Sequence, residues 1–139
     1  MNTLVVDTSV FIKWLNQNNE QLLENADRIL EDVRTGQAEL VVPELIKYEI
    51  GNVLLKGKQL TPKQAYISLG TAYSLPVTFV TESEQQAKET YTLAHKLGIS
   101  YYDASFISLA KQYDATLVTD DIKHQGQDSN VKVIALKDY

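Results

Sequence analysis

Residues 4–14 read LVVDTSVFIKW, and this stretch predicts how the fold begins. The apolar run that ends at Val6 predicts a first strand over residues 3–6, and the residues behind it predict a short helix over residues 9–16. Asp7 lies at the junction, directly after the strand. A strand followed by a helix is the repeating unit of parallel sheets, so this stretch points to an α/β fold.

The same alternation of short apolar runs and helical segments continues along the chain. Helices are indicated by apolar residues at helical spacing, by Thr61 as an N-cap, and by Pro43 and Pro62 in first turns. Further strands are predicted over residues 39–42, 77–80, 116–119 and 132–135. Further helices are predicted over residues 20–35, 43–56, 62–74, 81–98 (opened by a capping box at residues 81–84) and 100–113. The polar residues 125–130 predict a loop. The pattern therefore predicts a mainly parallel sheet with helices on both faces.

The bulk composition is that of one globular domain spanning residues 1–139. Hydrophobic residues make up 44% of the 139, charged residues make up 22%, and there is no cysteine, which excludes disulfides and thiolate ligands. No secretory signal or membrane-spanning apolar segment is recognisable, so we expect a cytoplasmic protein that does not enter the membrane. A net charge of −5 argues against binding nucleic acid through a broad basic surface, but it does not exclude a nuclease.

Four acidic positions stand where carboxylates are locally out of place. Asp7 ends one apolar run, and Asp120 and Asp121 follow another, Leu117 and Val118. Glu49 and Asp103 lie on the apolar faces of two predicted helices. Carboxylates are rarely buried alone, because an unpaired charge is costly in an apolar surrounding. If the acids converge in the fold, a divalent cation would resolve the conflict.

The predicted topology makes that convergence plausible. In open parallel sheets, ligands bind at the carboxyl ends of the strands. Asp7, Asp120 and Asp121 directly follow strands, and Glu49 and Asp103 lie in early turns of helices that leave or approach the same edge.

Each acid also has an ordinary structural explanation. Asp103 can cap a helix and complement its dipole. Glu49 can be a glutamate at the edge of the core, paired with a lysine such as Lys56, although its expected position in mid-helix argues against capping. Asp7, and Asp120 with Asp121, are compatible with simple turns. The argument for a site rests on all four positions together.

Three stretches carry a resemblance to a known family. They are LVVDTSVFIKW (residues 4–14), PELIKYEIGNVL (residues 43–54) and YYDASFISLAKQYDATLVTDD (residues 101–121). In this order and approximate spacing they resemble the PIN-domain ribonucleases, and most of all the VapC-type toxins of bacterial and archaeal type II toxin–antitoxin pairs. The resemblance implies a three-layer α/β/α sandwich around a parallel sheet.

Carried onto this chain, the resemblance assigns the family's acids one by one. The first acid of the family matches Asp7, the second matches Glu49 and the third matches Asp103. The fourth usually follows a threonine by two positions and so matches Asp121, but its neighbour Asp120 keeps this last assignment open.

The same resemblance implies accessory polar groups beside these acids. Ser9 stands two residues after the first acid, and Asn52 stands three residues after the second, where it can orient the carboxylate. Thr119 is the threonine that precedes the fourth acid.

The function implied by the resemblance is metal-dependent cleavage of RNA phosphodiester bonds. Mg²⁺ or Mn²⁺ would be held by Asp7, Glu49 and Asp103, with Asp121 or Asp120 completing the site; one or two ions are both compatible with this set. Carboxylate oxygens suit these hard ions, which lower the pKa of bound water. The resemblance further implies a homodimer and a small antitoxin that blocks the site. Apolar surface on helices 20–35 and 43–56 would serve such a partner.

Three alternatives remain open at this point. The protein could be a PIN nuclease of RNA processing outside toxin–antitoxin systems, which a missing upstream antitoxin reading frame would indicate. It could be a non-catalytic PIN-like module that binds RNA or protein, although all four acid positions are filled. A phosphatase of the haloacid-dehalogenase type is disfavoured, because Ser9 occupies the position of its second aspartate.

Overall fold

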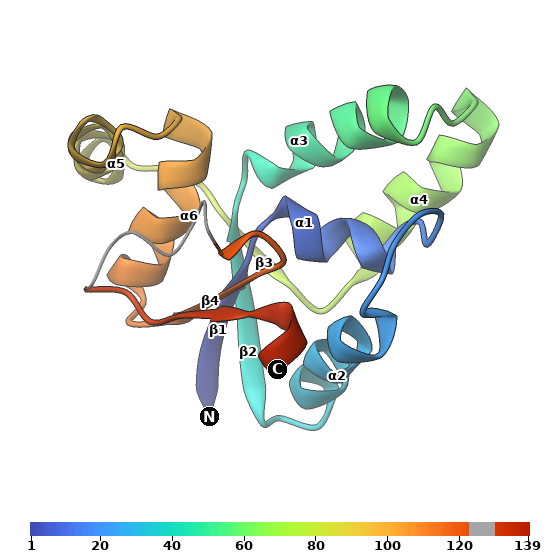
Figure 1. Cartoon of the computed structure of the whole chain (residues 1–139), viewed down its shortest axis with the longest axis horizontal. Helices are drawn as coiled ribbons and strands as arrows, with labels where there is room; N and C mark the ends of the chain where they lie inside the picture. The colour runs from blue at the N-terminus through green and yellow to red at the C-terminus, as the bar shows by residue number, and fades with distance from the viewer. Residues whose placement is uncertain (123–129) are drawn as a thin grey trace.

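The computed structural model describes residues 1–122 and 130–139, which fold around one parallel sheet of five strands (Figure 1). The order across the sheet is β3-β2-β1-β4-β5, and every neighbouring pair is parallel. The strands are β1 (Asn2–Val6), β2 (Ala38–Pro43), β3 (Thr78–Val80), β4 (Thr116–Thr119) and β5 (Val133–Ala135). The five predicted strands and their parallel arrangement are confirmed.

Helices cover both faces of this sheet, so the three-layer sandwich is confirmed as well. Figure 1 shows α5 and α6 on one face and α1 and α2 on the other. The helices are α1 (Thr8–Phe11), α2 (Leu23–Arg34), α3 (Ile46–Asn52), α4 (Pro62–Ser74), α5 (Glu84–Leu97) and α6 (Tyr101–Gln112). A 3₁₀ turn at Ile12–Trp14 extends α1, a π-helical turn at Val53–Gly57 extends α3, and a 3₁₀ turn at Leu136–Asp138 follows β5. In the described part of the chain, no helix is long and apolar enough to span a membrane.

The core forms where the two central strands meet α6. Val5, Val6, Leu117 and Val118 are fully buried, as expected for parallel strands covered on both faces. In α6, every residue from 104 to 110 is buried. A strand and a helix that are this apolar leave few places for charge, which restricts the acids to the ends of these elements.

The connection after β2 differs from the prediction. Pro43 ends the strand, where it pairs with Val80 of β3, instead of opening the next helix. A proline is tolerated at a strand end because few ladder hydrogen bonds are lost there. Helix α3 therefore begins only at Ile46, and Glu49 lies in its first turn. The expectation that Glu49 stands in mid-helix was wrong, whereas its expected place in an early turn of this helix is confirmed.

Three other element starts also shifted. The capping box expected at residues 81–84 is wrong, because Ser83 accepts the capping hydrogen bond from the Gln86 N–H at 3.1 Å and α5 begins at Glu84. Helix α2 starts at Leu23, after Leu22 in the left-handed region. The helix expected over residues 9–16 divides into α1 and a 3₁₀ turn. The loop predicted over residues 125–130 lies, except for its last residue, outside the described residues.

Candidate active site

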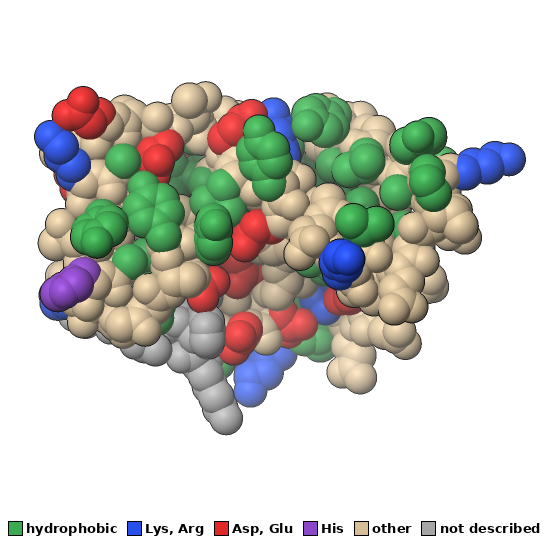
Figure 2. Space-filling view, turned by 90° about the horizontal axis from the view of Figure 1, so that it is seen from above, with side chains coloured by type: hydrophobic (Ala, Val, Ile, Leu, Met, Phe, Trp, Pro, Cys, Tyr) green, Lys and Arg blue, Asp and Glu red, His purple; other side chains and the backbone are tan. Residues whose placement is uncertain are grey.

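The predicted acids meet in a cavity of about 160 Å³ at the carboxyl edge of the sheet. Figure 2 looks onto this edge and shows acidic side chains gathered in a central hollow between two lobes that carry exposed hydrophobic groups. Four carboxylates line the cavity, together with Thr8, Ser9 and Phe106; we call it the acidic cavity, and its acids are Asp7, Glu49, Asp103 and Asp121. Four separate segments of the chain supply them.

Asp7 is the most enclosed of these acids, with 6% of its surface exposed. Its carboxylate accepts hydrogen bonds from Ser9 Oγ and Thr119 Oγ1, both at 2.5 Å. The Ser9 hydroxyl oxygen in turn accepts a hydrogen bond from the backbone N–H of Asp120 at 3.0 Å, and the Thr119 hydroxyl oxygen accepts one from the backbone N–H of Asp121 at 2.9 Å. Two hydroxyl groups thus join the turn after β1 to the turn after β4 and hold Asp7 in one orientation.

Glu49 is half-buried, and its environment favours the protonated form. Thr8 Oγ1 donates a hydrogen bond to Glu49 Oε1 at 2.6 Å, so its partner is Thr8 rather than Lys56. Burial raises the pKa of Glu49 above its ordinary value, the negative charges of Asp103 and Asp7 raise it further, and the bond from Thr8 opposes them. Glu49 is therefore electrostatically coupled to two acids that are remote in sequence.

Asp103 combines a structural position with a place in the cavity. Its backbone N–H is bound by Ser100 Oγ at 3.0 Å, which caps α6 as predicted. Its side chain lines the acidic cavity, one turn before Phe106. The capping explanation therefore accounts for the backbone near Asp103, but the carboxylate faces the other acids.

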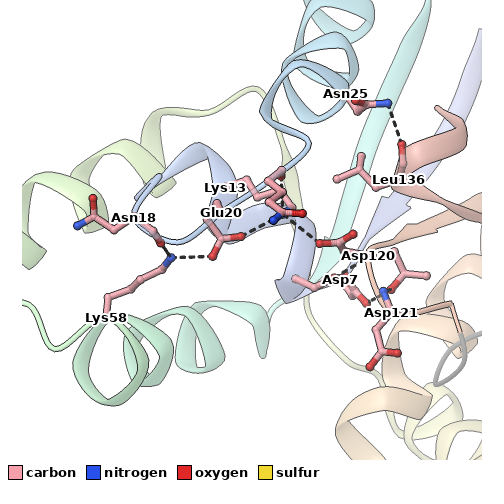
Figure 3. Close-up of polar contacts among 12 residues, drawn as sticks. Asp7, Lys13, Asn18, Glu20, Asn25, Lys58, Asp120, Asp121 and Leu136 are labelled. Carbon is pink, nitrogen blue, oxygen red and sulfur yellow. Dashed lines mark hydrogen bonds and ion pairs between the residues drawn. The ribbon is translucent and has the colours of Figure 1, made fainter.

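The structure separates the two neighbouring aspartates at the end of β4. Asp121 lines the acidic cavity, whereas Asp120 Oδ2 forms an ion pair with Lys13 Nζ at 3.0 Å (Figure 3). Asn52 is exposed and lines an adjoining hollow with Thr8, Ser9 and Glu49. All residues singled out from the sequence thus lie at or beside one edge, with Asp120 turned toward a different partner.

The family is decided by a direct match of the sequence. The PIN domain matches residues 4–128, which is most of the chain. The chain belongs to the PIN-domain family. The family expected from the sequence is thereby confirmed. No curated protein matches the sequence closely enough to narrow this assignment.

Solved structures of similar fold agree with this PIN-domain assignment. A chain of VapBC2 from Rickettsia felis, bound to a promoter DNA fragment, aligns with a TM-score of 0.71 and 17% identity over 96% of this chain and 98% of that one. DNA-bound VapBC from Salmonella typhimurium aligns with a TM-score of 0.69 and 14% identity over 98% of this chain and 99% of that one. VapC20 from Mycobacterium tuberculosis, described as a sarcin–ricin loop cleaving toxin, aligns with a TM-score of 0.63 and 13% identity over 82% of this chain and 86% of that one. At these identities the likeness concerns the fold.

PIN-domain nucleases generally use divalent metals, and the acidic cavity offers the donor atoms that such ions prefer. All of its ligand candidates are oxygens. Within residues 1–122 and 130–139, however, no three acidic or histidine side chains are already placed to hold one ion. The cavity therefore fits Mg²⁺ or Mn²⁺ in chemistry, and its carboxylates would have to draw together around the ion.

A second group of charges adjoins this PIN-domain cavity. Lys13 is only 2% exposed, and its Nζ contacts Glu20 Oε1 at 3.0 Å and the Gln21 carbonyl at 2.8 Å in addition to Asp120. Lys58 Nζ contacts Glu20 Oε2 at 2.6 Å and the Asn18 carbonyl (Figure 3). We call Lys13, Glu20, Lys58 and Asp120 the lysine network.

The lysine network was missed in the sequence. Its signal is a single lysine inside the apolar run of Val10, Phe11, Ile12, Trp14 and Leu15. A buried lysine needs an acidic partner, but nothing in the sequence indicates which acid supplies it. The network explains why Glu20 does not begin α2, because its side chain is held between two lysines.

Proposed function

We propose that this PIN-domain protein is a metal-dependent endoribonuclease that hydrolyses RNA phosphodiester bonds. The observation that carries the proposal is the convergence of four carboxylates, from four separate segments, in one cavity at the carboxyl edge of the sheet. Asp120, which lies outside this cavity, is by contrast held by an ion pair with a buried lysine. Within the cavity, burial raises the pKa of Glu49, and the charges of Asp103 and Asp7 raise it further.

In this proposal, Asp7, Glu49 and Asp103 hold Mg²⁺ or Mn²⁺, and Asp121 completes the site from its exposed side. A divalent cation here would supply positive charge to the attacked phosphate and lower the pKa of the attacking water. Asp7 is oriented for this task by Ser9 and Thr119, and Glu49 is oriented by Thr8. Such hydroxyl partners act on the geometry of a site through the carboxylates they hold.

The direct test is cleavage of a mixed cellular RNA pool by the purified protein. We expect cutting with Mg²⁺ or Mn²⁺, no cutting with EDTA, and loss of cutting in Asp103→Asn. A folded protein that neither cuts RNA nor binds Mn²⁺ would contradict the proposal and favour a non-catalytic binding module.

We also propose that the nuclease is the toxin of a toxin–antitoxin pair and forms a homodimer. Similar folds occur in VapBC complexes, and VapC20 is described as a cleaving toxin. Large exposed hydrophobic side chains offer surface for partners on α3 and α4, at Tyr48, Tyr66 and Ile67. The expectation of exposed apolar surface on helix 20–35 is wrong, because Ala26 and Ile29 of α2 pack on the core and Leu30 is buried as well.

Co-expression tests the biological role. A toxin should arrest growth, and the product of an adjoining short reading frame should relieve the arrest and co-purify with the protein. Harmless expression without such a neighbour would favour the alternative of a PIN nuclease in RNA processing. Gel filtration with light scattering tests the dimer.

A further inference from the structure

A second cavity of about 140 Å³ opens at the same edge of the sheet. It lies between the ends of β2 and β3 and the helices α5 and α6. Its walls are partly apolar, from Pro43, Val80 and Leu109, and partly aromatic, from Tyr101 and Tyr102. Nothing in the proposed metal site uses this space.

One polar atom in the wall of this cavity is unusual. Of the buried side-chain nitrogen and oxygen atoms in the described residues, only Thr90 Oγ1 lacks a hydrogen-bond partner. Thr90 is 1% exposed and lines the cavity. Two other helical threonines, Thr71 and Thr92, donate to the carbonyl four residues earlier at 3.1 Å and 2.9 Å. A buried hydroxyl without a partner is costly, so Thr90 indicates that this cavity is a binding site for a ligand with a polar group.

Helix α6 places this cavity directly beside the acidic cavity. Asp103 and Phe106 line the acidic cavity, whereas their chain neighbours Tyr102 and Ser105 line the second one. The two cavities thus lie on adjoining sides of the first turns of α6. The width of a helix, roughly 10 Å, sets the scale of their separation. A nucleotide next to a phosphate in the acidic cavity can span this distance.

The size and lining of the cavity fit a single aromatic ring with polar edges. An engineered cavity of about 150 Å³ is known to hold benzene. Tyr102 is 61% exposed at the mouth, where an unstacked base can lie against its ring. Glu44 and Glu82 supply carboxylate acceptors, and Thr90 supplies a hydroxyl that can donate or accept.

We propose that this cavity binds a pyrimidine base of the RNA strand next to the cleaved bond, with cytosine preferred. Cytosine fits because its exocyclic amine can donate to a carboxylate while its ring carbonyl accepts from a hydroxyl. The inference rests on the proposed ribonuclease function, which it deepens by naming the base that positions the substrate.

The test combines a binding measurement with a cleavage measurement. Amide signals of the full-length protein are followed by NMR during titration with cytidine 5′-monophosphate and, separately, adenosine 5′-monophosphate. Cleavage positions are mapped in a randomised RNA pool. The variants are Thr90→Val and, as a matched control on the same helix, Thr92→Val, whose hydroxyl is exposed.

We expect cytidine monophosphate to shift the signals of Thr90 and Ser105 more than adenosine monophosphate does. Thr90→Val should weaken cytidine monophosphate binding about tenfold and erase the pyrimidine preference at one position beside the cut. Thr92→Val should change neither. Thr90→Val should melt at an unchanged or higher temperature, because a methyl group replaces a hydroxyl that has no partner in the free protein.

The two proposals fail in distinguishable ways. Binding of cytidine monophosphate in this cavity without RNA cleavage would leave the base site standing and overturn the nuclease. Cleavage with no nucleotide shift at Thr90, and with the same base preference in Thr90→Val, would overturn the base site alone. A change from dimer to monomer in Thr90→Val, with base preference kept, would instead assign the cavity to an interface between two copies and likewise overturn the base site.

Discussion

The acidic cavity and the lysine network lie on the two sides of a single peptide bond, between Asp121 and Asp120. In the lysine network, two lysines face two acids, so the charges balance and the side chains pair closely. In the acidic cavity, four acids gather and the pKa of Glu49 rises because burial and its acidic neighbours penalise its charge. The difference teaches that this edge is held together by ion pairs on one side, whereas on the other side acids gather and raise the pKa of Glu49, which is typical of a functional site.

The largest effect should come from substituting one acid in each group. Glu49→Gln should lower RNA cleavage roughly a thousandfold, because it removes a charged ligand from the metal site. Asp120→Asn should lower it by no more than about tenfold, because Asp120 acts only on the position of its neighbour. Initial rates on one RNA substrate measure both. Equal losses in the two variants would abolish the distinction between the groups.

Metal binding should stabilise the folded protein through the acidic cavity and not through the lysine network. At a Mn²⁺ concentration a hundred times its dissociation constant, the gain in unfolding free energy is about 2.7 kcal/mol. Thermal melts should therefore shift upward in wild-type protein and in Asp120→Asn but not in Asp103→Asn, and EDTA should reverse the shift. A shift retained in Asp103→Asn would place the ion elsewhere.

Breaking the lysine network should cost stability rather than metal binding. Lys13→Met leaves two acids without their shared partner, and since Glu20 and Asp120 keep 16% and 35% of their side-chain surface in solvent, the loss should be about 2 kcal/mol. The matched control is Lys88→Met, whose pair with Glu84 is 72% and 84% exposed and should contribute no more than about 0.5 kcal/mol. Urea unfolding compares the two variants. Similar losses would mean that Lys13 is not an internal charge.

The smallest effect is the pH dependence of Glu20. Burial alone would raise the pKa of Glu20, but the hydrogen bonds and charges of Lys58 and Lys13 outweigh it and hold the pKa below the ordinary value of 4.5. The ion pairs of Glu20 with Lys13 and Lys58 therefore stabilise the fold above pH 4.5, and this contribution is lost as the pH falls through the lowered pKa of Glu20. The stability difference between wild type and Glu20→Gln should shrink below about pH 4.5. A constant difference down to pH 3 would argue against charged pairing.

The fold was largely readable from the sequence because its signals are local. Apolar runs such as Leu117 and Val118 predict buried strands, and Thr61 and Ser100 mark helix starts by hydrogen bonds within four residues. The errors fall where long-range contacts override such signals. Pro43 joined the sheet because it pairs with Val80, and Glu20 stayed outside α2 because two lysines hold it.

The sequence by itself determined which acids are out of place, since a carboxylate on an apolar face or after an apolar run is visible in the residue pattern. Only the tertiary structure decided where they lie relative to one another. It brought Glu49 to Asp103 and Asp7, directed Asp121 into the cavity and Asp120 to Lys13, and left Thr90 beside a second cavity with a buried hydroxyl that has no partner among the described residues. Charge pairing and hydrogen bonding depend on groups far apart in the chain. The different positions of the neighbours Asp120 and Asp121 therefore carry no local signal in the sequence and are resolved only by tertiary packing.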